Sequence, residues 1–70
     1  MTELDDAAAE LRAARAELRA ELLLAAEWAR MNAPEDPVAA LITERVSAAF
    51  DRVRCAGIAR VTAIRDHSAP

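Results

Sequence analysis

Apolar residues recur with helical spacing in both halves of the chain. Residues 3–31 place one narrow apolar stripe on a helix, made of Leu4, Leu11, Leu18, Leu22, Ala25 and Ala29. Residues 37–65 carry a second stripe with spacings of three and four, made of Ile42, Val46, Phe50, Val53, Gly57, Val61 and Ile64. No segment alternates with period two over the length of a strand. The pattern therefore predicts an all-α protein.

The segment between the two stripes predicts a sharp turn. Asn32 is expected to end the first helix in the left-handed conformation, and Pro34 cannot continue that helix. Asp36 then serves as the N-cap of a second helix, with Pro37 at its first position. Thr2 and Asp5 have the spacing of an N-terminal capping box. We expect one domain over residues 1–70, an antiparallel hairpin with helices at about 3–31 and 37–65, a hinge at 32–36 and a frayed tail at 66–70.

The quantity of apolar side chains exceeds what a two-helix hairpin buries. Hydrophobic residues make up 54% of the 70 residues, whereas a hairpin covers one stripe per helix and has no third element. The economical solution is self-association, with two hairpins forming a dimeric four-helix bundle. The residues predicted to form the bundle interface are Leu11, Leu18, Leu22, Ile42, Val46, Phe50 and Val53.

Charges flank the stripe of the first helix with opposite signs on its two sides. Arg12, Arg15 and Arg19 lie on one flank, and the acidic flank includes Glu10, Glu17 and Glu21. Like charges four residues apart disfavour an isolated helix by a few tenths of a kcal/mol each. The arrangement makes sense if each flank meets the opposite sign on a neighbour, so these six residues are predicted to set the register of association.

Two large side chains stand off the main stripe close to the turn. Trp28 and Met31 are predicted to contact an external protein partner, because large side chains outside the self-association interface are those that form hot spots. The expected function is that of a small helical oligomerisation and protein-interaction module, acting as an adaptor, regulator or accessory subunit. Its expected partners are a second copy of itself and another protein.

The scarcity of chemically versatile residues argues against catalysis. The chain has one Cys, one His and one Gly, so an intramolecular disulfide, a zinc cluster and a glycine-rich phosphate loop are excluded. Cys55 lies beside Arg54 without a histidine base within helical reach, and a small buried or half-buried thiol is the simpler interpretation. We predict no enzyme activity, no catalytic residue, no cofactor and no metal.

Two other function classes stay open. The helix at 37–65 carries all five arginines of the C-terminal half, so a small dimeric DNA-associated transcriptional regulator is the main alternative, although the net charge of the chain is −3. A minimal enzyme with an arginine-lined anion pocket between subunits is the third.

Location is predicted from composition and from the apolar runs. No apolar run approaches the roughly 20 residues of a membrane span. The first residues are acidic where a signal peptide is basic. A bacterial cytoplasmic protein without membrane contact is expected.

Overall fold

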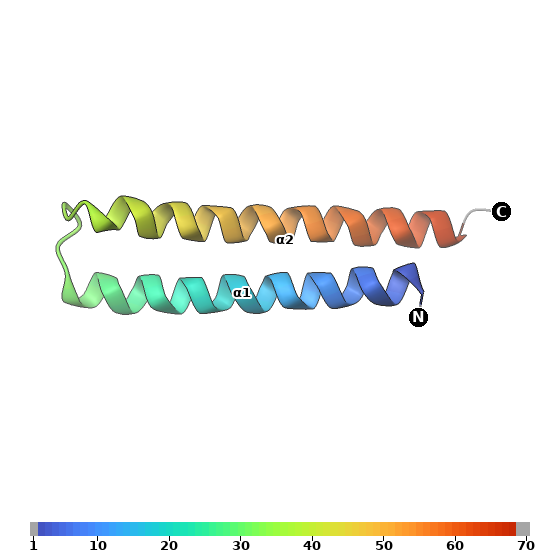
Figure 1. The fold of residues 1–70 in the computed structure, drawn as a ribbon, viewed down its shortest axis with the longest axis horizontal. Coiled ribbons are helices and arrows are strands. Elements are labelled where there is room, and N and C mark those ends of the chain that lie inside the picture. The colour runs from blue at the N-terminus through green and yellow to red at the C-terminus, as the bar shows by residue number, and fades with distance from the viewer. Residues whose placement is uncertain (1, 69–70) are drawn as a thin grey trace.

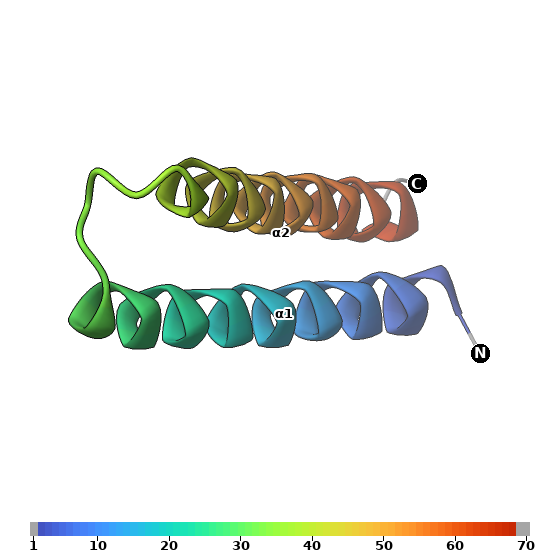
Figure 2. The same cartoon turned by 60° about the vertical axis from the view of Figure 1, so that its left-hand side comes forward.

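The chain forms a long antiparallel helical hairpin (Figure 1). A computed structural model describes residues 2–68, which contain helix α1 (Glu3–Met31), helix α2 (Val38–Ser68) and no strand. The helices lie side by side along their length in both views (Figures 1 and 2), and the body measures 56 by 16 by 12 Å. The predicted all-α hairpin is confirmed. The start of α1 and the end of α2 lie at one end of the body, called the open end here, and the turn forms the other.

Side-chain caps define both ends of α1. The Thr2 hydroxyl oxygen accepts a hydrogen bond from the Asp5 backbone N–H at 3.2 Å, so Thr2 is the expected N-cap. Asn32 does not adopt the predicted left-handed conformation, because its φ of −136° and ψ of 155° are extended. Its side-chain Nδ2 instead donates to the Trp28 carbonyl oxygen at 2.9 Å. The last four carbonyl groups of a helix have no hydrogen-bond donor within the helix. This bond supplies a donor to one of them, as a left-handed C-cap normally does.

Helix α2 begins as the sequence predicts and continues further than predicted. An Asp36 carboxylate oxygen accepts from the Val38 backbone N–H at 2.9 Å, with Pro37 between them. The helix ends at Ser68 instead of residue 65, so Asp66, His67 and Ser68 are helical and not frayed. No proline follows Pro37 before Pro70, and the helix therefore has no reason to stop earlier. The rest of the predicted tail, residues 69–70, lies outside the described residues.

The contact between the helices is narrow and rich in alanine. The buried residues of the described chain are Ala7, Leu11 and Ala49, and Ala49 has no exposed surface. Half-buried positions repeat on the same two helix faces, with Leu4, Ala14, Leu18, Glu21, Ala25 and Trp28 on α1 and Ala39, Ile42, Val46, Val53, Ala56 and Ala63 on α2. Together with the buried residues, these positions are three or four residues apart, as in a coiled coil, except for the seven residues from Ala56 to Ala63. Small side chains at the contact let two helix axes come close together.

The face that α2 turns toward α1 differs from the predicted stripe. Ile42, Val46 and Val53 do face α1, but Phe50, Val61 and Ile64 are 53%, 59% and 45% exposed. Alanines occupy the inward positions instead. A helix turned so that Phe50 pointed inward would hold the axes apart along the whole hairpin, and the leucines of α1 would lose contact with α2. The alanine face gives the closer approach.

Candidate interaction surfaces

The hairpin has two broad sides. Residues seven apart along either helix lie on the same side, so one contact between the helices identifies the other residues of its side. The ion pair of Glu17 with Arg52 marks one side, called the Glu17 face here. A groove lined by Ala29 of α1 and Thr43 of α2 marks the other side. Seven-residue steps from this groove reach Leu22 and Arg15 on α1, then Phe50, Gly57 and Ile64 on α2. These residues together with Ala29 and Thr43 form what is called the Phe50 face.

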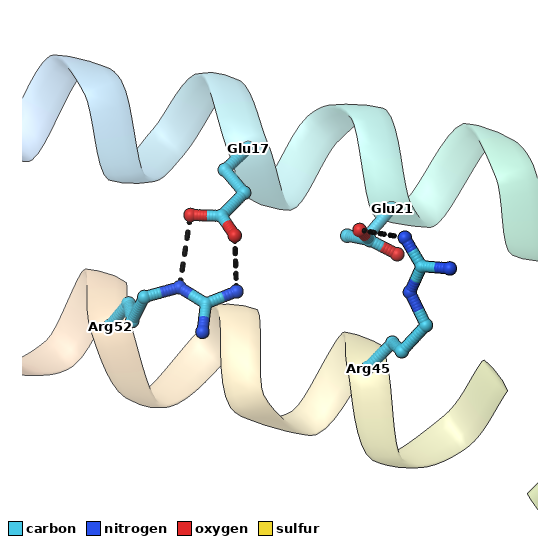
Figure 3. A network of polar contacts seen from close by, with 4 residues as sticks. All are labelled: Glu17, Glu21, Arg45 and Arg52. Atoms are coloured by element: carbon cyan, nitrogen blue, oxygen red, sulfur yellow. Dashed lines mark hydrogen bonds and ion pairs between the residues drawn. The ribbon is translucent and has the colours of Figure 1, made fainter. Parts of the chain in front are cut away.

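The Glu17 face is held by two ion pairs between the helices (Figure 3). The Arg52 guanidinium binds Glu17 with two parallel bonds, one from Nη2 to Oε1 and one from Nε to Oε2 at 2.9 Å. Arg45 Nη2 lies 2.9 Å from Glu21 Oε1. Glu17 and Glu21 therefore meet arginines of the same chain, and their pairing with a neighbouring copy stays a prediction. The antiparallel direction of α2 brings its arginines to the acidic flank of α1.

The Glu17–Arg52 pair is expected to stabilise the hairpin only weakly. The side chains are 45% and 50% exposed, and exposed pairs contribute about 0.2–1 kcal/mol. In a double-mutant cycle of Glu17→Gln and Arg52→Gln, we expect a coupling energy within that range in urea unfolding at low salt. The coupling should fall toward zero in 1 M salt because mobile ions screen exposed charges. A coupling above about 2 kcal/mol, or one insensitive to salt, would contradict the exposed geometry.

The arginines predicted to set register stay free of ion pairs within residues 2–68. Arg12, Arg15 and Arg19 are exposed, and none of them lies within 4.0 Å of an acidic oxygen of the described chain. Glu10 is also exposed and lines a shallow hollow at the open end with other acids of both helices. The charged flanks therefore face outward on different sides of α1.

The structure divides the predicted bundle-interface residues into two groups. Leu11 is buried and Leu18 half-buried against α2, and Ile42, Val46 and Val53 are half-buried against α1. These five residues pack within the hairpin. Leu22 and Phe50 are 43% and 53% exposed on the Phe50 face, so they remain available to a second molecule.

The residues predicted to contact an external partner lie near the turn. Met31 is 79% exposed, whereas Trp28 is half-buried. Trp28 lines the groove of the Phe50 face together with Ile42, Pro34 and Ala39. The groove was not predicted, because it requires knowing which sides of the two helices come together at the turn. The sequence does contain a signal for it, because Ala25 lies seven residues after Leu18 and Ala39 lies seven residues before Val46.

Gly57 borders a second hollow, which is lined by residues of α2 alone. A Cβ built on Gly57 would meet no atom within 4 Å, so the packing of α1 on α2 does not require glycine there. Arg54, Ile58, Val61 and Arg65 surround the open position. Glycine in a helix interior costs about 1 kcal/mol relative to alanine. The missing side chain of Gly57 leaves room for another helix, and α1 does not occupy that room.

The arginines of α2 are largely engaged in ion pairs. Arg45 and Arg52 bind acids of α1, and Arg54 lies 3.0 Å from Asp51 within α2. Arg60 and Arg65 are exposed and make no ion pair within residues 2–68. Any of these three arginines that bound a phosphate would have to leave its intramolecular carboxylate partner.

Cys55 is an exposed free thiol, so the expectation that this side chain is buried or half-buried is wrong. His67 is exposed near the open end. Within residues 2–68, no three His, Cys, Asp or Glu side chains gather so that they could hold a metal ion. Neither helix, as far as residues 2–68 extend, has the length and apolarity needed to cross a membrane.

Comparisons of the chain with protein-family models, with curated proteins and with solved structures each found no match.

Proposed function

We propose that this protein is a small oligomerisation and interaction module, in which two hairpins associate into a four-helix bundle. The observation that carries the proposal is the excess of exposed apolar surface. Only Ala7, Leu11 and Ala49 are buried in the described chain. Ten large apolar side chains are exposed, namely Leu22, Leu23, Leu24, Met31, Val38, Leu41, Phe50, Ile58, Val61 and Ile64.

The apolar surface that the hairpin leaves in water favours association. Removing apolar surface from water contributes about 25 cal/mol per Å², and contiguous exposed apolar patches mark interaction sites. A chain of this size is also too small to be stabilised strongly by a single core. Association supplies the missing core, so the same event stabilises the fold and creates the functional unit.

Within this proposal the assembled bundle acts as an adaptor, regulator or accessory subunit and carries out no reaction itself. Met31, with Trp28 beside it in the groove near the turn, offers a large apolar contact to another protein. A bacterial cytoplasm suits a chain with one exposed free thiol, because reducing compartments keep such thiols unpaired.

Light scattering and circular dichroism on the same samples test the proposal. Over a tenfold range of protein concentration, we expect a mass of twice the 7.6 kDa chain, with strong helicity throughout. A fully helical monomer at every concentration would overturn self-association, because the exposed side chains would then be tolerated in water. A weakly helical monomer would overturn it as well, and would mean that folding requires a different protein.

A further inference from the structure

We infer that the second copy docks on the Phe50 face in the opposite direction, with Phe50 of each copy seated over Gly57 of the other. The inference rests on the proposed self-association and specifies its surface and orientation. Gly57 lowers the stability of α2, and the contact with α1 does not require a glycine. The hollow at Gly57 opens outward between Arg54, Ile58 and Val61.

The residues along the Phe50 face of α2 alternate between hollows and large side chains. Thr43 lies at the groove that Trp28 and Ile42 line, and Gly57 lies at the second hollow. Phe50 and Ile64 are the exposed large side chains, at 53% and 45%. The four positions follow one another at seven-residue steps, each equal to about 10.5 Å along a helix. Along α2 this face therefore presents, in order, the groove at Thr43, the large side chain of Phe50, the hollow at Gly57 and the large side chain of Ile64.

This order is complementary to itself when one copy is reversed. An antiparallel α2 of a second copy places its Phe50 over Gly57 and its Ile64 over the groove at Thr43. The two-fold symmetry of such a dimer repeats both contacts, so each of the four positions is filled. A parallel alignment would set Phe50 against Phe50 and leave the two hollows facing each other. Large side chains that enter hollows of a facing helix are the usual packing of helix bundles.

The dimensions of the face also fit a second copy. A broad side of 56 by 16 Å has a projected area of roughly 900 Å², and a standard interface buries about 800 Å² per partner. The Glu17 face carries its exposed large apolar side chains only at the turn end, where seven-residue steps from Glu17 and Arg52 reach Leu24, Met31 and Val38. Its middle is occupied by the Arg45 and Arg52 ion pairs, and its open end carries the acidic hollow with Glu10 and Asp66.

Disulfide cross-linking tests the orientation without altering Phe50 or Gly57. In the full chain carrying Cys55→Ser, one sample carries Thr43→Cys and another carries Ile64→Cys. We expect a cross-linked dimer when the two variants are mixed and oxidised, and little when either is oxidised alone, because a disulfide requires Cα atoms within about 7 Å. Cross-linking of either variant with itself would indicate a parallel dimer and overturn the inference.

Failure of the inference can be told from failure of the proposed function. A dimeric mass without any cross-link would leave self-association standing and reject the Phe50 face. A monomeric mass would reject both. If instead an unrelated amphipathic helix covers this face, the chain would stay monomeric until that helix is supplied.

Filling the hollow is the second test. Gly57→Leu removes the space for Phe50 while favouring the helix itself, so the dimer dissociation constant should rise at least tenfold with helicity preserved. Ala59→Leu is the matched control, because Ala59 is exposed on the Glu17 side of α2. Its dissociation constant should stay within about twofold of the parent value. Tighter or unchanged association of Gly57→Leu would contradict the inference.

Discussion

Leu11→Ala is expected to remove most of the folded helix at 25 °C. Leu11 is the only large side chain among the buried residues of the described chain, with 5% of its surface exposed. Truncating a buried leucine costs about 2–5 kcal/mol, from lost transfer free energy and from the cavity that remains. A chain of this size has only about 3–5 kcal/mol from a single core. The loss is therefore comparable with the whole stability.

Leu23→Ala is the matched control for this change. Leu23 belongs to the same helix, loses the same atoms and is 63% exposed. Its free energy of unfolding should change by less than about 1 kcal/mol. Urea unfolding followed by circular dichroism, at one protein concentration for both variants, measures the difference. Equal losses for the two variants would mean that Leu11 is not the centre of the hairpin contact.

Ala49→Leu is expected to separate the two helices. Ala49 has no exposed surface, so three added carbon atoms have no space between α1 and α2. Overpacking of a tight site costs about 1–3 kcal/mol. Here the cost should be about 3 kcal/mol, the upper end of that range. The two helix axes keep one distance along the hairpin, so pushing them apart at Ala49 also weakens the contacts on either side. We expect a fall in Tm of at least 10 °C, given about 4–8 °C per kcal/mol for a domain of this size.

Ala48→Leu provides the comparison, because it makes the same change one residue earlier at an exposed position. Both variants alter helix propensity equally, so the difference in Tm reports packing alone. The pair also distinguishes two rotations of α2. If Phe50 faced α1, as the strongest apolar stripe predicts, position 49 would be near the edge and the two variants would melt at similar temperatures.

Local chemistry was sufficient to predict where both helices begin and where α1 ends, but not that α2 continues to Ser68. Thr2 and Asp36 cap their helices in the structure as their side chains predict from sequence. Asn32 ends α1 at the predicted place by a different hydrogen bond. These features depend on residues within four positions of one another, which a linear pattern contains. The helical class and the hairpin follow from the same short-range information.

The rotation of α2 about its own axis was decided only by the tertiary structure. The helix carries apolar residues in more than one direction, and periodicity favoured the direction of Phe50 and Ile64 over that of Ala49. Which direction is buried depends on how closely two helix axes can approach, and that distance is a property of both helices together. The alanine side of α2 is buried against α1 because small side chains let the two helix axes come closest together.

The partners of the charged residues were decided in the same way. Sequence alone identified the acidic flank of α1 correctly as a surface that needs opposite charge, but it could not identify where that charge comes from. The antiparallel register of the hairpin brings Arg52 to Glu17 and Arg45 to Glu21. Residues 24 and 35 positions apart become neighbours only through the turn. Short-range patterns thus determined the elements of this protein, and the close approach of two helices determined which of their faces remain for function.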